Sequence, residues 1–315
     1  MCRGVSILCP TILVLCTFAA TSCGARFTPR LILGGSLDAV HQDNSTNNNI
    51  LPSSDSLDEC DTCVCGVSRQ VRIVNGDTTN TNEFPWAVAI EYQGLHHCGA
   101  SLITRKHLVS AAHCFYGFAQ NQFGLRLPDN EEYHIASIKI HELYDKQTFN
   151  NDIAIIELDR RIPMDGPAST VCLPRVFERF NYIGSTGVAI GWGRLGEGRP
   201  LSLQLRKVEL PIMSEEECLR SEYPKTRVTR NMFCAGYLEG KKDSCAGDSG
   251  GAFNVRKGNG AMDLVGIVSF GRGCARPKFP GVYTKVSNYL SWIDRQIQHE
   301  CKCLPPRDPH SLNNE

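Results

Sequence analysis

Three short motifs, far apart in the chain, contain the residue types that nucleophilic catalysis requires. The most informative is the segment 243–251 (DSCAGDSGG), in which Ser249 is followed by two glycines. A serine hydroxyl is a weak nucleophile at neutral pH, so it needs a base to remove its proton and backbone N–H donors for the developing oxyanion. Glycines let the backbone turn and approach a substrate closely. Ser249 is therefore a candidate nucleophile.

The other two motifs supply a base and an acid. His113 stands in the segment 111–114 (AAHC), at the end of an apolar run, and Asp152 stands in the segment 150–156 (NNDIAII), before another. Each motif alone is weak evidence, because a single histidine or aspartate beside a strand is usually an ordinary surface or core residue. Their combination with Ser249 is what suggests a catalytic site.

The elements that must position these residues are predicted to be β-strands. From Ile73 onward the chain contains short apolar runs separated by turns, a pattern typical of all-β proteins. The expected strands are 86–91, 107–112, 153–158, 187–192 and 264–270. The segment 257–260 (KGNG) predicts a hairpin, and the only helix indicated is late, with Val286, Tyr289, Leu290, Ile293 and Ile297 on one face.

Composition excludes several classes of function and indicates an oxidising compartment. The 315 residues carry 33 Lys+Arg and 33 Asp+Glu, so no net charge favours nucleic acid or an anionic membrane surface. A hydrophobic content of 42% is enough to form a core. The 16 cysteines are more than a cytosolic protein usually keeps reduced, which points to a secreted, extracellular protein.

The first 25 residues have the features of a cleaved signal peptide. Arg3 precedes an apolar stretch over 5–20, and small residues follow up to Ala25. The alternative is a membrane anchor, but the stretch contains Pro10 and is shorter than the ~20 residues that span a bilayer. Cleavage after Ala25 would remove four cysteines and leave an even number, 12.

A polar segment without periodicity follows, and we interpret it as a leader. It includes an Asn-rich run and a candidate glycosylation site at Asn44, whose occupancy stays open. The expected organisation is a signal peptide over 1–25, a propeptide or leader with a cysteine cluster over 26–72, a catalytic domain over 73–300, and a tail over 301–315.

The three motifs, in the order His113, Asp152, Ser249, resemble the trypsin/chymotrypsin family of serine proteases. The resemblance extends from Ile73 to about Gln298. It implies an all-β fold of two antiparallel six-stranded β-barrels with a C-terminal α-helix, and an active site between the barrels. The first barrel would end near Pro174.

The resemblance also implies the catalytic roles. Ser249 would attack the scissile carbonyl, His113 would move the proton, and Asp152 would orient the imidazole. The N–H groups of Gly247 and Ser249 would form the oxyanion hole. Because a neutral His113 is needed as the base, activity should rise with pH in the range where histidines lose their proton.

Specificity is implied by residues around the nucleophile. Asp243 matches the base of the primary pocket in trypsin-like members, where a buried carboxylate requires a cation such as a substrate Arg or Lys. Ser244 can add a hydroxyl contact, and Gly271 and Gly281 would leave room for a long side chain. Phe270, where many members have tryptophan, would alter the ledge for the substrate residues that precede the basic one. The substrate-binding residues implied are Asp243, Ser244, Ser269, Phe270, Gly271 and Gly281.

The segment 72–76 (RIVNG) resembles the activation site of a zymogen. Cleavage after Arg72 would free the amine of Ile73 to pair with Asp248, and this would order the oxyanion loop. The expected partners are protein substrates with Arg or Lys at the cleavage site and an upstream trypsin-like activating protease. Protein inhibitors are further candidate partners. The alternative is a processing site without a switching role.

The disulfides implied by the resemblance are Cys98–Cys114, Cys218–Cys234, Cys245–Cys274 and Cys65–Cys172, the last keeping the leader attached. Four cysteines then remain, Cys60, Cys63, Cys301 and Cys303, whose pairing stays open. Two bridges between the termini are expected, and a zinc site is the alternative. We expect no cofactor, no metal, no nucleic acid and no membrane anchor. Four other histidines, His96, His97, His134 and His141, receive no role.

Two other functions stay open at this stage. A noncatalytic protease homologue would act as a binding protein, although such proteins usually lack a member of the triad. A secreted hydrolase could prefer esters, although no acyl-chain pocket is apparent. The physiological substrate and the activating protease are not specified by one acidic pocket.

Overall fold

The computed structural model describes residues 63–69, 79, 81–129, 131–175, 182–298 and 300–307. The signal peptide expected over 1–25, Asn44, Cys60 and the activation residues Arg72 and Ile73 lie outside the described residues.

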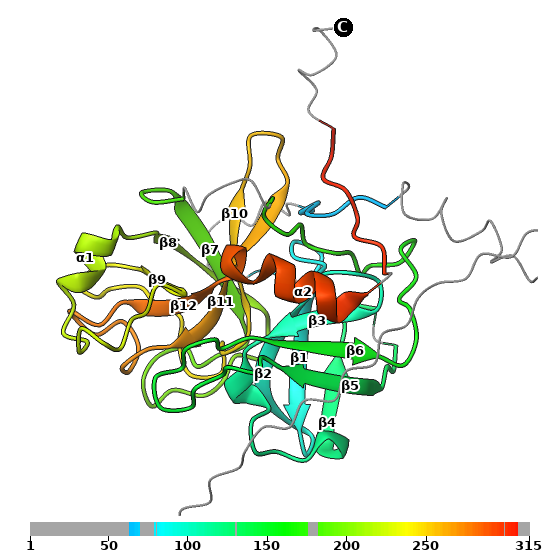
Figure 1. Cartoon of the computed structure of the whole chain (residues 1–315), viewed down its shortest axis with the longest axis horizontal. Helices are drawn as coiled ribbons and strands as arrows, with labels where there is room; N and C mark the ends of the chain where they lie inside the picture. The colour runs from blue at the N-terminus through cyan, green and yellow to red at the C-terminus, as the bar shows by residue number, and fades with distance from the viewer. Residues whose placement is uncertain are drawn as a thin grey trace, which may run out of the picture. The chain divides into compact units, whose positions relative to one another are not determined.

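The first half of the described chain folds into one six-stranded antiparallel sheet (Figure 1). Its order is β4-β1-β2-β3-β6-β5. The strands are β1 (Ala87–Tyr92), β2 (Leu95–Leu102), β3 (His107–Ser110), β4 (Phe123–Arg126), β5 (Ile135–Ile140) and β6 (Ala154–Leu158). β-branched and aliphatic side chains dominate β3 and β6, and both strands are almost entirely buried, as strands covered on both faces require.

The second half forms a matching six-stranded antiparallel sheet, in the order β8-β7-β10-β11-β12-β9. Its strands are β7 (Thr186–Gly191), β8 (Arg206–Pro211), β9 (Met232–Ala235), β10 (Ala252–Arg256), β11 (Met262–Phe270) and β12 (Gly281–Lys285). The hairpin expected at 257–260 joins β10 to β11, and Gly260 has the positive φ of 84° that this turn requires. The prediction of two six-stranded antiparallel barrels is confirmed.

The expected C-terminal helix is α2 (Leu290–Ile297), which begins directly after the 3₁₀ turn η4 (Val286–Tyr289). Leu290, Ile293 and Ile297 are buried, as the periodicity predicts. A second, five-residue helix, α1 (Glu215–Leu219), was not predicted. Its signal is a capping box, in which Ser214 accepts a hydrogen bond from the Glu217 N–H and the Glu217 carboxylate accepts one from the Ser214 N–H. Two further 3₁₀ turns are η2 (Ala112–Cys114) and η3 (Gln120–Gln122).

The leader segment 63–69 is held against the second half of the chain and the tail. Val64 forms a parallel bridge with Leu304, and Cys63 is bonded to Cys303. Cys65 is bonded to Cys172. The segment 63–69 therefore has two covalent attachments, one to the domain at Cys172 and one to the tail at Cys303.

Candidate active site

His113 and Asp152 meet because the strands that carry them pair. β3 and β6 run antiparallel with Ser110 opposite Ala154, so the residues just after β3 and just before β6 emerge at the same sheet edge. His113 then lies in η2, and its Nδ1 is 2.8 Å from Oδ2 of Asp152. The backbone N–H of His113 donates to the other carboxylate oxygen at 2.9 Å. The Asp152 carboxylate therefore fixes both the ring and the backbone of His113.

Asp152 is fully buried and receives a further hydrogen bond from the second sheet. Ser269, in β11, donates its hydroxyl proton to Oδ2 at 2.6 Å. Thr284, in β12, donates to the backbone carbonyl of Asp152 at 2.8 Å. A buried carboxylate is costly without hydrogen bonds, and Ser269 together with the ring and backbone N–H of His113 supplies them. Ser269 was expected to be only a substrate-binding residue, but it also positions the acid.

The segment 249–251 packs against the end of β3, close to His113 in sequence. The carbonyl of Ser249 accepts a 2.7 Å hydrogen bond from the Gly99 N–H. At Gly250 a side chain would meet Ser110 Oγ at 2.2 Å and the Ala111 nitrogen at 3.2 Å, and φ is +77°. Only glycine fits this position. Within the described residues the Ser249 hydroxyl makes no hydrogen bond with His113, and such contacts often tighten only when substrate is bound.

The loop that contains Gly247 has a hydrogen-bond partner, His96, to which no role was predicted from the sequence. Nε2 of His96 donates to the Gly247 carbonyl at 2.8 Å, because a carbonyl can only accept. The imidazole lies beside Trp192, with ring centroids 6.1 Å apart. His96 therefore restrains the orientation of the peptide group between Gly247 and Asp248. This group adjoins the N–H of Gly247, which was predicted to face an oxyanion. No local pattern marks His96, because 151 residues separate the two partners.

Asp248 is buried in a backbone cradle. Its carboxylate accepts hydrogen bonds from the Gly193 N–H at 2.7 Å and from the Cys245 N–H at 2.8 Å, while burial raises its pKa. Added Cβ atoms at Gly191 and Gly193 would come within 2.2 Å and 2.5 Å of this carboxylate. A cavity of about 530 Å³ reaches Asp248 and is also lined by Lys207. The predicted partner, Ile73, lies outside the described residues.

Asp243 presents a carboxylate oxygen that no described residue satisfies. Oδ2 accepts a hydrogen bond from the Ala275 N–H at 3.1 Å, whereas Oδ1 is buried and has no hydrogen-bond partner among the described residues. Burial raises the pKa of Asp243 to about 7. A Cβ at Gly281 would lie 2.7 Å from Oδ1, and one at Gly271 would lie 4.0 Å from Oδ2. The site therefore combines a desolvated acid with glycine walls.

Ser244 has a hydrogen-bond partner within the protein. Its hydroxyl lies 3.1 Å from the hydroxyl of Tyr283, which is fully buried. This hydrogen bond connects the residue beside Asp243 to the core of the second sheet.

An aromatic ledge extends from His113 along the second sheet. We define this ledge as Phe149, Phe270 and Tyr223. The rings of His113 and Phe149 are 5.3 Å apart, those of Phe149 and Phe270 5.6 Å, and those of Phe270 and Tyr223 5.8 Å. Phe270 was expected here, while Phe149 and Tyr223 were missed because they come from loops in both halves of the chain.

The four disulfides implied by the resemblance are present in the structure. Cys98–Cys114 braces η2, which carries His113, and Cys245–Cys274 closes the loops around Asp243. The zinc alternative is wrong for Cys63 and Cys303, whose sulfur atoms are bonded to each other. Cys301 is also disulfide-bonded.

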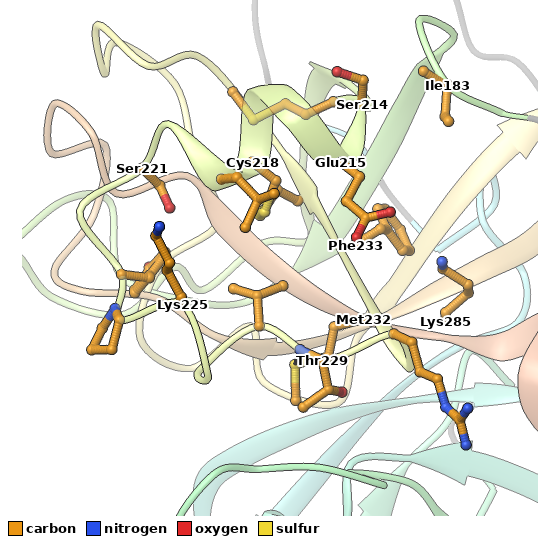
Figure 2. A pocket seen from close by; sticks show the side chains of 17 residues that line it. Ile183, Ser214, Glu215, Cys218, Ser221, Lys225, Thr229, Met232, Phe233 and Lys285 are labelled. Atoms are coloured by element: carbon orange, nitrogen blue, oxygen red, sulfur yellow. Dashed lines mark hydrogen bonds between the residues drawn. A yellow bond between two sulfur atoms is a disulfide. The ribbon is translucent and has the colours of Figure 1, made fainter.

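A second cavity lies between α1 and β9, behind the loop 221–230 (Figure 2). It has a volume of about 220 Å³. Its lining includes the apolar residues Met213, Cys218 and Met232. It also includes the charged residues Lys225 and Lys285, which Figure 2 shows on opposite sides of the cavity. None of the predicted catalytic residues lines it.

Comparison with known proteins agrees with this architecture. Residues 73–293 match the family model described as Trypsin. Cationic trypsin-3 of Rattus norvegicus is 40% identical over 235 residues, 72% of this chain and 90% of the relative. Proclotting enzyme of Tachypleus tridentatus is 35% identical over 254 residues, which are 73% of this chain and 68% of the relative.

A longer relative matches the same region. Transmembrane protease serine 7 of Rattus norvegicus is 38% identical over 242 residues, which are 72% of this chain but only 28% of the relative. The chain thus spans little more than a quarter of that protein. In the part of this chain that the structure describes, no helix is both long and apolar enough to cross a membrane.

Proposed function

The chain belongs to the trypsin family of serine proteases, and from this premise we propose that it is a zymogen that, once cut after Arg72, cleaves proteins after Arg or Lys outside the cell. The observation that supports this specificity is the buried Oδ1 of Asp243, which lies between glycine walls and has no hydrogen-bond partner among the described residues. The His113–Asp152 pair supports the proposed catalysis.

In the proposed mechanism, Ser249 attacks the scissile carbonyl while His113 takes the hydroxyl proton. His113 later delivers the proton to the leaving amine, and Asp152 holds the imidazole through the 2.8 Å hydrogen bond to Nδ1. The N–H groups of Gly247 and Ser249 stabilise the oxyanion. Loss of one such donor generally costs about 2.7–4 kcal/mol of transition-state stabilisation, so the His96 contact to Gly247 is expected to matter.

The proposed preference for Arg and Lys follows from electrostatics. A carboxylate whose pKa is raised by burial is poorly solvated, and a guanidinium or ammonium that reaches Oδ1 replaces the missing solvation. Uncharged side chains would leave this atom unsatisfied. Gly271 and Gly281 leave the space that a long side chain needs.

The proposed activation uses the cavity beside Asp248. Thr79 is anchored at one end, since its N–H donates to the Leu205 carbonyl and its hydroxyl to Glu83, which pairs with Lys207 at 2.7 Å. Lys207 and Asp248 both line the cavity. The six residues 73–78 lie between the proposed cleavage site and Thr79. An extended chain of six residues spans up to about 20 Å. A new ammonium at Ile73 could therefore enter the cavity and pair with the Asp248 carboxylate.

Export as a soluble protein is the remaining part of the proposal. The apolar stretch over 5–20 and the disulfides support a signal peptide and an oxidising environment. The transmembrane relative makes a membrane-anchored protease the second candidate. Expression of the full chain in secretory cells, followed by N-terminal sequencing of protein in the medium, distinguishes them: soluble protein that begins near residue 26 supports secretion, whereas protein retained in the membrane fraction excludes it.

The function is tested by labelling and cleavage. After cleavage at Arg72, an organophosphonate should label Ser249, and peptide amides with Arg or Lys should be hydrolysed. Asp243→Asn should lower kcat/KM for these substrates about a hundredfold or more, because an unpaired buried charge costs about 3–5 kcal/mol. Ser249→Ala should abolish both labelling and hydrolysis. Full activity with the Arg72–Ile73 bond intact would refute the zymogen, and absence of labelling would favour a noncatalytic homologue.

A further inference from the structure

Arg227 stands over the aromatic ledge that begins at His113. Its guanidinium carbon is 5.0 Å from the ring centroid of Phe149 and 4.6 Å from that of Phe270. The guanidinium also donates to the carbonyl of Gln147. Contact with two ring faces and a carbonyl holds the cation in place above the ledge.

The charge of Arg227 has no close acidic partner. No carboxylate lies within 4 Å of the guanidinium in the parts of the chain that are described. Asp145 feels its charge, but hydrogen bonds from Thr148 and Gln147 are the main reason that the pKa of Asp145 is low, and they occupy its oxygens. A half-buried guanidinium thus retains the capacity to bind an anion.

A second arginine increases the positive potential at the far end of the ledge. Arg272, next to Gly271, lies over the ring of Phe279 at 4.8 Å, and its N–H donates to the hydroxyl of Tyr223. The neighbouring Lys278 is neutralised by Glu222 at 2.8 Å. The ledge is therefore bordered by two arginines, of which Arg227 lies directly on its surface.

We propose that Arg227 is a specificity-determining residue that selects an acidic side chain among the three substrate residues preceding the cleaved basic residue. This inference rests on the proposed function, in which Asp243 binds the basic residue and the ledge holds the residues before it. A Glu or Asp carboxylate on the ledge would reach the guanidinium and form the ion pair that no described carboxylate provides. The selected substrate class is a peptide with one Glu or Asp among the three residues that precede the cleaved Arg or Lys.

The same loop provides a matched control. Lys225 is two residues from Arg227 but lines the cavity behind the loop, as Figure 2 shows, together with Thr229. Lys225→Gln removes one positive charge from the loop but leaves the cation over Phe149 and Phe270 in place. It therefore separates a specific contact from a general change in charge.

The test uses the full chain cleaved after Arg72, with its active sites titrated. Substrates are fluorogenic peptide amides that end in Arg, with Glu or Gln at one of the three preceding positions and alanine at the others. At one position, kcat/KM for Glu should exceed that for Gln about three- to tenfold at low salt, the size expected for one partly buried ion pair. This ratio should decrease towards one in 1 M NaCl.

The variants assign the preference to a residue. Arg227→Gln should bring the ratio of Glu to Gln close to one, Arg227→Lys should retain part of it, and Lys225→Gln should leave it unchanged. Arg227→Glu should instead favour a lysine at that position. Because each ratio is measured within one enzyme, a partly unfolded variant does not alter it.

Two results would overturn the inference while leaving the proposed function intact: a ratio near one at all three positions, or a ratio unaffected by Arg227→Gln. Loss of the ratio only in Arg272→Gln would transfer the role to Arg272 and also overturn the assignment. If the titrated enzyme cleaved none of the Arg substrates, the proposed function itself would fail.

Discussion

The hydroxyl of Ser269, in β11 of the second sheet, donates a 2.6 Å hydrogen bond to Oδ2 of Asp152, just before β6 of the first. The same oxygen lies 2.8 Å from Nδ1 of His113. The acid of the proposed triad is thus positioned by both sheets, and His113 is aligned only when the two are correctly packed against each other.

Ser269→Ala tests this connection. Removal of a hydrogen bond to a charged group costs about 1.5–3 kcal/mol, so kcat/KM for an Arg peptide amide should fall about tenfold or more. Labelling of Ser249 by an organophosphonate should slow in parallel. Ser137→Ala, which removes a hydroxyl bonded to Glu157 in the first sheet, is the control and should retain activity. Unchanged kinetics in Ser269→Ala would show that the contact has no role in catalysis.

Binding of a small cation should depend on the protonation of Asp243. Because burial raises the pKa of Asp243 to about 7, the carboxyl is mostly protonated at pH 5 and must lose its proton to pair with a cation. The affinity for benzamidine should therefore increase from pH 5 to pH 7, by up to about tenfold per pH unit, and level off above. Calorimetry in buffers of different ionisation enthalpy should detect proton release below pH 7.

Asp243→Asn separates this effect from other titrating groups. Any pH dependence that remains in this variant belongs elsewhere, for example to Asp248, whose pKa is also raised by burial. Affinity that does not change between pH 5 and pH 8 in the wild-type enzyme would contradict the protonation of Asp243.

The raised pKa of Asp243 also affects the stability of the folded protein. The pKa of Asp243 is higher in the folded chain than the ordinary value of 3.8, so the folded state binds more protons between these two values. The contribution of this group to stability should therefore decrease as pH rises from about 4 to about 7. Comparison of urea unfolding of wild type and Asp243→Asn over this range measures it, and parallel pH profiles would contradict it.

Gly193→Ala should impair activity through Asp248. The new Cβ would lie within about 2.6 Å of three carboxylate atoms, and overpacking of this kind costs about 1–3 kcal/mol. If this cost falls on the active conformation, kcat/KM after cleavage at Arg72 should decrease about five- to 150-fold. Gly258→Ala is a matched control, since nothing lies within 4 Å of its Cβ position. Equal activity of both variants would exclude a functional role for the Asp248 cradle.

The leader should remain attached to the protease after activation, even without one of its disulfides. In the double variant Cys65→Ala/Cys172→Ala, the bond between Cys63 and Cys303 still joins the leader to the tail. Non-reducing electrophoresis of the cleaved variant should show a single band in which the leader and the protease are joined by a disulfide. Reduction should release the leader. Release without reductant would contradict the Cys63–Cys303 bond.

Much of the fold follows from local patterns. Apolar runs between turns predict five of the twelve strands described, β1, β3, β6, β7 and β11, and the KGNG turn predicts the hairpin between β10 and β11. The other strands are short or carry polar residues, so their pairing partners rather than their own pattern define them. The periodicity of 286–297 predicts α2. The five-residue α1 was missed because its capping box is a short-range signal without an apolar stripe.

The sequence alone determined which residue types could carry the chemistry, because the motifs around His113, Asp152 and Ser249 are local and their order is distinctive. Only the tertiary structure decided that Ser269 supports Asp152, that His96 contacts Gly247, and that Arg227 lies over Phe149 and Phe270. These partners are separated by 117, 151 and more than 40 residues, respectively. The physical reason is that hydrogen bonds and cation–π contacts act over a few ångströms, and only the packing of the two sheets brings such distant residues within that range.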